Sequence, residues 1–154
     1  MNKTIRITRT CKIEDLSAGL KAAMRAHVAQ YQLGAIESDI LMCCETVSTQ
    51  NKNGLFGTTR ETTASAVYVT PKWLVWADST GRNNANAGSA QLKQIDIHDY
   101  ETTAMFEITP DHGLNITGRY TNVNQTGITF IALGADPDGQ RFRELLGQAM
   151  KKAA

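Results

Sequence analysis

The sequence predicts a mainly β fold of the α+β class, with seven antiparallel strands and a helix at each end of the strand region. Short alternating apolar runs recur at intervals of about 8 to 15 residues between turn-forming residues, which is typical of an antiparallel sandwich or barrel. Two longer segments, 15–33 and 136–152, instead repeat their apolar residues at helical spacing. Nothing indicates a second domain, so we expect one domain over residues 1–154.

The segment 66–77, AVYVTPKWLVWA, is the richest in apolar residues around a turn. Pro71 fixes its own φ and cannot donate to a sheet ladder, so the break between the two apolar runs predicts a tight hairpin. Alternation along the runs divides the side chains between two faces. We expect Val67, Val69, Trp73, Val75 and Ala77 on one face, and Tyr68, Leu74 and Trp76 on the other.

The N-terminal region, 1–34, is expected to be an extension with one helix. Residues 4–8 alternate apolar and polar side chains, which indicates a short edge strand. From Asp15 onward the apolar positions follow helical spacing, with Asp15 or Ser17 as the N-cap and Gly34 as the stop. The helix therefore has one apolar face to pack against the rest of the chain.

Residues 36–133 are expected to form the barrel. Further strands are predicted at 36–49, 91–100, 105–109, 114–120 and 128–132. Two polar, glycine-containing segments are predicted to be loops: a hairpin loop at 49–63, with Leu55 and Phe56 at its tip, and a mobile loop at 78–91.

The C-terminal segment 136–152 gives the clearest helical pattern. Asp136 is a capping residue and Pro137 suits the first turn. Five apolar residues then follow at i, i+3, i+4, i+7 and i+8 spacing: Phe142, Leu145, Leu146, Ala149 and Met150. We expect this helix to close over an apolar opening of the strand region.

The run VYVTPKWLVW, at 67–76, resembles a hairpin of bacterial pleckstrin-homology-like (PH-like) and GRAM-like domains, in which a phrase such as L-x-V-T-x-x-R-L-I-x recurs. The matching positions are Tyr68, Val69, Thr70, Lys72, Leu74 and Val75. The stretch LKQIDIHDYE is similar to the family's approach to the barrel corner, and DGQRFRELLGQAM to its terminal helix. The resemblance covers 36–150 and implies a seven-stranded, partly open PH-like barrel capped by a C-terminal helix, with the N-terminal helix as an addition.

Composition and charge narrow the function classes. The chain has 42% hydrophobic and 20% charged residues and a net charge of +1, so we expect no nucleic-acid partner, because such binding needs a strongly basic surface. No apolar run approaches the roughly 20 residues that span a bilayer. The N-terminus has basic residues without an apolar block behind them, so we expect a cytoplasmic protein.

The three cysteines, Cys11, Cys43 and Cys44, have no metal-ligand spacing. An odd count without a secretion signal favours reduced thiols. We expect them to be small buried hydrophobic residues rather than a redox or metal centre.

Few residues could carry out catalysis. His98-Asp99 and Asp111-His112 are adjacent pairs, but neighbouring side chains on a strand diverge. No phosphate-binding glycine motif is present. We therefore predict that the chain is not an enzyme and has no catalytic, cofactor or metal residues. Two alternatives stay open: a two-histidine metal site, and a small enzyme or carrier with a His/Asp site. The enzyme or carrier alternative requires that side chains from a set of five lie together in one concavity: His98, Asp99, Asp111, His112 or Tyr120.

The remaining candidates lie on the surface. In eukaryotic PH domains the loop after the first strand holds phosphoinositides with clustered cations, whereas the loop here has only Lys52 and Arg60, on either side of Leu55 and Phe56. We predict a non-catalytic intracellular binding or scaffold module that contacts a protein partner or a second copy of itself through an edge strand, a loop or the groove of the N-terminal helix. These four residues are the candidate contact. The alternative is peripheral binding of the same loop to an anionic membrane surface.

Overall fold

The computed structural model describes residues 4–79, 84–121, 123 and 125–154. It confirms a mainly β fold of the α+β class. The described residues form two antiparallel sheets, one with strand order β1-β2-β3-β4-β5 and one with order β6-β7-β8, together with three α-helices. The two sheets are not joined into a closed barrel.

The strands are β1 (Thr4–Thr10), β2 (Met42–Gly54), β3 (Gly57–Val69), β4 (Trp73–Ser79), β5 (Ala85–Gln91), β6 (Ile95–Asp99), β7 (Gly113–Arg119) and β8 (Thr126–Ala132). The helices are α1 (Ala18–Gln30), α2 (Met105–Ile108) and α3 (Pro137–Ala153). In the described part of the chain, no helix is both long enough and apolar enough to cross a membrane.

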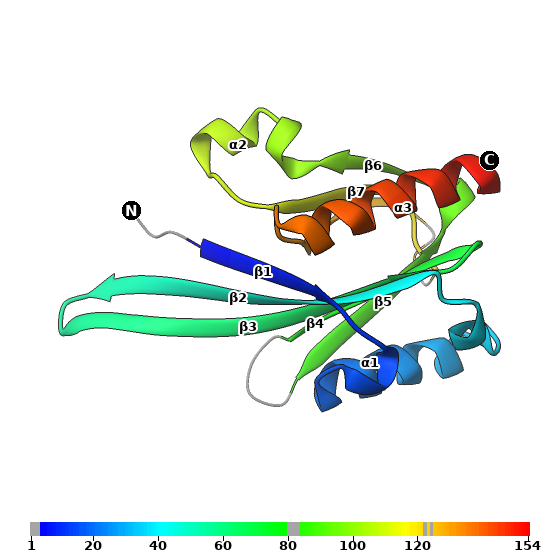
Figure 1. Cartoon of the computed structure of the whole chain (residues 1–154), viewed down its shortest axis with the longest axis horizontal. Helices are drawn as coiled ribbons and strands as arrows, with labels where there is room; N and C mark the ends of the chain where they lie inside the picture. Colours follow the sequence, from blue (N-terminus) through cyan, green and yellow to red (C-terminus); the bar gives the residue numbers. More distant parts are fainter. Residues whose placement is uncertain (1–3, 80–83, 122, 124) are drawn as a thin grey trace.

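The elements form layers on both faces of the larger sheet. Helix α1 lies on one face, and α3 and the smaller sheet lie on the other (Figure 1). Leu20 and Met24 of α1 pack in the first core, and Phe142 and Leu146 of α3 pack in the second. The apolar spacing of both helices is therefore explained by burial against the sheet.

The predicted hairpin around Pro71 is present. The hydroxyl oxygen of Thr70 accepts hydrogen bonds from the backbone N–H groups of Lys72, at 3.2 Å, and Trp73, at 2.9 Å. Val69 pairs with Leu74, which leaves four residues between them.

The predicted division of faces in this hairpin is wrong. Paired residues point to the same face, so Val67 and Val69 lie with Trp76 and Leu74 toward α3, and Tyr68 lies with Val75 toward α1. The expected division would require an odd number of residues between the paired ends of the two strands, whereas the turn has four.

Other segments also differ from expectation. The strand expected from residue 36 begins at Met42, after a short 3-10 helix at Ile36–Asp39, and the strand expected at 105–109 is the helix α2. The segment 78–91, expected to be a loop, contains β5, with residues 80–83 outside the described residues. The composition of β5 does not indicate a strand, because it contains small residues such as Gly88. Gly88 lies directly opposite the large side chain of Trp76, where a small residue is required.

The segment 49–63 is also not a loop. It is the outer half of β2 and β3, which remain paired rung by rung up to Gly54 and Gly57. Asparagine and glycine made it resemble a loop, whereas its threonines suit a strand. We call residues 50–61 the arm: β1 pairs with β2 no further than Gln50, and β4 pairs with β3 only from Ser65.

Candidate functional site

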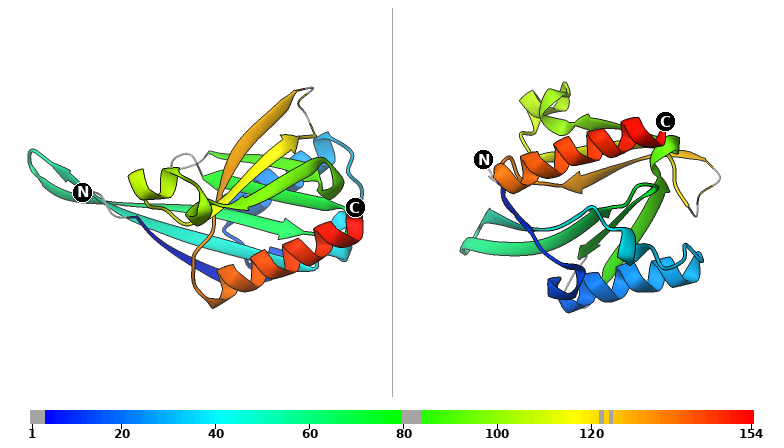
Figure 2. Two further views of the ribbon diagram at one scale, coloured as in Figure 1. Left: turned by 90° about the horizontal axis from the view of Figure 1, so that it is seen from above. Right: turned by 45° about the vertical axis from the view of Figure 1, so that its right-hand side comes forward.

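The arm leaves the body of the molecule as a two-stranded ribbon. Two perpendicular views show it projecting beyond both packed layers (Figures 1 and 2). Between Gln50 and Glu61 the only apolar side chains are those of Leu55 and Phe56. The arm therefore has no core of its own and carries its apolar surface at the far end.

The tip of the arm is a two-residue turn between Gly54 and Gly57. Leu55 and Phe56 expose 99% and 104% of their reference areas, so neither side chain folds back on the protein. Gly57 has a φ of +121°, a value that side-chain-bearing residues avoid. This glycine closes the turn and lets both bulky residues keep an ordinary backbone.

The cations beside the tip do not form a basic patch. Lys52 makes an ion pair with Glu61 at 2.6 Å. Arg60 has no ion-pair partner among the described residues. The N-terminal arginines are also paired, Arg6 with Asp111 and Arg9 with Glu45. One unpaired cation therefore accompanies the apolar tip.

A second surface feature lies at the opposite end of β2. It is an open groove of about 490 Å³, which we call the Leu41 groove. The residues that line it come from the segment after β1 and from the entry to β2, and include Cys11, Ile13, Glu14, Ser38, Leu41 and Met42. Leu41 exposes 48% of its area at the groove, so part of the apolar lining is open to solvent.

Outside the arm, the edges of the larger sheet are covered in part. The outward N–H groups of Thr8 and Thr10 in β1 donate to carboxylates of Asp136 and Asp138, at 2.8 and 2.9 Å. At the other edge, Ser89 of β5 accepts a hydrogen bond from the backbone of Thr121 at 3.0 Å. These contacts occupy groups that would otherwise pair with another strand.

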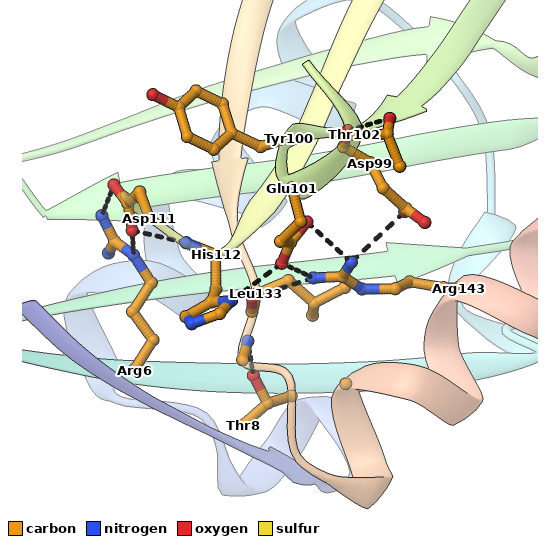
Figure 3. A network of polar contacts seen from close by, with 12 residues as sticks. Arg6, Thr8, Asp99, Tyr100, Glu101, Thr102, Asp111, His112, Leu133 and Arg143 are labelled. Carbon is orange, nitrogen blue, oxygen red and sulfur yellow. Dashed lines mark hydrogen bonds and ion pairs between the residues drawn. The ribbon is translucent and has the colours of Figure 1, made fainter. Parts of the chain in front are cut away.

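A network of charged side chains joins the two sheets (Figure 3). Arg143 of α3 donates to both carboxylate oxygens of Glu101, at 3.0 and 3.1 Å, and Glu101 also contacts Nδ1 of His112 at 3.0 Å. Nearby, Arg6 of β1 donates to both carboxylate oxygens of Asp111, at 2.6 and 2.8 Å.

The network holds its carboxylates in the ionised form. Burial alone would raise the pKa of Glu101, but hydrogen bonds from Arg143 and His112 outweigh it and lower the pKa. Burial would likewise raise the pKa of Asp111, and the bonds from Arg6 and from the His112 backbone lower it. Each carboxylate accepts hydrogen bonds from three donors, and these bonds stabilise its ionised form.

The residues of the predicted His/Asp alternative do not all meet. Asp99, Asp111 and His112 belong to the network, with Asp99 at 3.3 Å from Arg143. Tyr120 instead packs edge-on against a tryptophan of the core. His98 and Asp99 line a cavity of about 390 Å³ together with Arg143, so this cavity borders the network. Across the residues that the structure describes, no three His, Cys, Asp or Glu side chains form a group that could hold a metal ion.

The tip of the arm could be predicted from the sequence, whereas the Leu41 groove and the charged network could not. Lys52, Leu55, Phe56 and Arg60 all lie on the arm as a group, because they occupy one hairpin. The Leu41 groove and the network were missed, since their members are separated by tens of residues and share no local pattern.

Comparison with known proteins gave no match: no family model, no curated protein and no solved structure matches this chain. The resemblance to PH-like and GRAM-like domains therefore stays a prediction.

Proposed function

We propose that this chain is a non-catalytic, intracellular protein-binding module that contacts its partner with the tip of the arm. The observation that carries the proposal is the complete exposure of Leu55 and Phe56 at the end of an otherwise polar ribbon. Burial of a large apolar side chain contributes about 1.5 to 3 kcal/mol of favourable free energy. Neither Leu55 nor Phe56 is buried within this chain, so this stabilisation is not realised there. A partner with an apolar pocket would supply that burial.

The arm itself supports this interpretation. An isolated two-stranded ribbon is marginally stable in water, and this one has cross-strand threonine, asparagine and glutamine pairs in place of packed apolar ones. Such a ribbon adds little to the stability of the body. Its length and its glycine-closed turn are explained if its role is to hold the tip away from the protein.

A protein partner fits better than a membrane. Each cation near an anionic surface contributes about 1 kcal/mol to membrane binding, and here Lys52 is neutralised by Glu61, which leaves Arg60. Two apolar side chains with one cation make a weak membrane anchor. The same pair is enough to form the centre of a protein contact, where an aromatic anchor fills a pocket.

The proposed fold includes the finer architecture that the resemblance implies. We take the two sheets with α3 packed between them as an open variant of the PH-like barrel. In this variant β1 precedes the added helix α1 and extends the larger sheet. The packed cores around Phe142 and Met24 support a filled interior without a ligand chamber.

The test is site-specific photo-crosslinking in cells that express the protein. A photoreactive phenylalanine analogue replaces Phe56, and in a matched control it replaces Ile128, which is 71% exposed on β8. We expect discrete protein adducts from position 56 that disappear when Leu55→Ser is added, and none from position 128. Absence of protein adducts, together with salt-sensitive binding to anionic vesicles that Leu55→Ser/Phe56→Ser abolishes, would assign the tip to a membrane surface instead.

A further inference from the structure

We infer that the partner of the tip is a second copy of this chain, and that Leu55 and Phe56 of one copy insert into the Leu41 groove of the next. This inference rests on the proposed function and names the partner of the same site. It joins two surface features that the fold leaves unexplained, an apolar projection and a partly apolar recess.

The size and lining of the groove suit the tip. Its volume of about 490 Å³ falls within the range of about 300 to 1,000 Å³ that holds small-molecule ligands, and a two-residue tip is no larger than such a ligand. Leu41 and Ile40 line the groove beside the buried residues Ile13 and Met42. Insertion would bury the exposed part of Leu41 together with both tip side chains.

The charges restrict how the tip can enter the groove. The groove carries two carboxylates, Glu14 and Glu37, and one cation, Lys12, which has no ion-pair partner among the described residues. Glu37 is paired with Arg25 at 3.0 Å, while the carboxylate of Glu14 has no ion-pair partner among the described residues. The arm carries Arg60, whose guanidinium is also unpaired within the described chain. A tip inserted with Arg60 beside Glu14 and away from Lys12 would bring an unpaired cation to an unpaired carboxylate, so the charges favour this one orientation.

The two features cannot meet within one chain. Met42 begins β2 at the groove and Gly54 ends β2 at the tip, so the thirteen-residue strand separates them by about 40 Å at roughly 3.3 Å per residue. The contact must therefore be made between copies. It uses two different surfaces, so it either closes as a two-fold dimer, in which each tip fills the groove of the other copy, or continues head-to-tail into a ring or a filament.

The first step of the test is sedimentation velocity of the full chain over a wide concentration range. We expect the wild-type protein to associate into a dimer or a larger species as its concentration rises. The tip variant Leu55→Ser/Phe56→Ser and the groove variant Leu41→Glu should each remain monomeric. Ile128→Ser is the matched control, because it removes an exposed apolar side chain elsewhere and should associate as the wild type does.

The decisive step is to mix the two monomeric variants. The tip variant keeps an intact groove and the groove variant keeps an intact tip, so the mixture has one working contact. We expect a 1:1 complex that does not grow further. Tip-to-tip association between copies predicts no complex in this mixture, so a mixture that stays monomeric overturns the inference.

A second groove variant controls for the possibility that Leu41→Glu prevents association by misfolding. Ser38→Trp fills the groove from an exposed position and should also block association while leaving the thermal midpoint unchanged. Reversing the charge with Arg60→Glu should weaken association about two- to fivefold, and adding Glu14→Arg should restore it. Unchanged affinity in both charge variants would contradict the predicted orientation of the tip.

The outcomes separate this inference from the proposed function. A wild-type chain that is monomeric at every concentration refutes self-association. If position 56 still crosslinks to a different protein, the tip is a binding element and only the identity of its partner is wrong. If position 56 gives no protein adducts either, both proposals fail.

Discussion

Arg6 of β1 and Asp111, which precedes β7, form a two-point ion pair between the larger sheet and the segment that leads into the smaller sheet. The side chains expose 14% and 22% of their areas, so the pair is largely withdrawn from solvent. The Arg6 guanidinium also lies over the ring of Phe130, 5.4 Å from its centroid. These contacts make the pair a clamp between the two sheets.

Breaking this clamp should destabilise the protein. Asp111→Ala leaves the guanidinium of Arg6 partly buried without its carboxylate, and we expect a loss of about 1 to 3 kcal/mol in the free energy of unfolding. Urea denaturation followed by circular dichroism measures it. Arg141→Ala is the control, since its 3.4 Å pair with Asp138 is more exposed and should be worth under about 1 kcal/mol. Equal losses in the two variants would show that the clamp contributes no more than a surface pair.

The network also predicts how stability depends on pH. Glu101 and Asp111 have folded pKa values below their ordinary values of 4.5 and 3.8, because donors from Arg143, Arg6 and His112 outweigh the effect of burial. Their contribution is fully present above the ordinary values and is lost as the pH falls through the folded ones.

The measurement for this prediction is the thermal midpoint between about pH 2 and pH 6. The wild-type midpoint should fall steeply with acid. Glu101→Gln/Asp111→Asn should start from a lower midpoint and fall less, because it no longer binds those two protons. Parallel curves for the two proteins would contradict the network as a source of acid sensitivity.

Much of the fold was predictable because local patterns report it directly. The α3 helix has its cap, Asp136, and its apolar face within one segment, and Asp136 accepts the expected hydrogen bond from Gly139. The Pro71 hairpin is equally local. The β5 strand and the arm were not predicted, because their strand conformation depends on pairing with neighbouring strands. Residues such as Gly88 and Asn53 have no strand preference of their own that would indicate this pairing.

The candidate site was predictable only in part. Leu55 and Phe56 could be found because two large apolar residues between glycines in a polar segment are conspicuous. Their projection could not, since it depends on how far β1 and β4 extend beside β2 and β3. The Arg6–Asp111 clamp could not be predicted either, because its partners are 105 positions apart.

The glycine of β5 opposite Trp76 should be intolerant of any side chain. A Cβ at Gly88 would lie 2.7 Å from ring atoms of Trp76, so Gly88→Ala must displace the indole. We expect a loss of about 1 to 3 kcal/mol from overpacking and a shifted tryptophan emission. Gly147→Ala, on the exposed face of α3 with nothing within 4 Å, should instead stabilise by about 0.5 to 1 kcal/mol. Two losses of equal size would contradict the assigned contact.

The tip should be unimportant for folding. Leu55 and Phe56 touch no core, so Leu55→Ser/Phe56→Ser should change the free energy of unfolding by less than about 0.5 kcal/mol. Phe142→Ala, at a fully buried position of α3, should cost about 3 to 5 kcal/mol. Both values come from urea titrations. A large loss in the tip variant would show that the arm packs on the body.

The thiols offer a chemical probe of the Leu41 groove. Burial raises the pKa of Cys43, and raises that of Cys44 to about 12, so neither should react with a disulfide reagent at pH 8 until the protein unfolds. Cys11 is only half-buried and lines the groove. Its pKa is also raised by burial, so it should react, but more slowly than a free thiol.

If the tip of a neighbouring copy occupies the groove, it covers Cys11. The labelling rate of wild-type Cys11 should therefore fall as protein concentration rises, whereas the rate in Leu55→Ser/Phe56→Ser should stay constant. Stopped-flow absorbance at several protein concentrations measures both rates, with Ile128→Ser expected to follow the wild type. Equal, concentration-independent rates in all three proteins would place the tip outside the groove, because an inserted phenylalanine cannot leave that thiol equally open to the reagent.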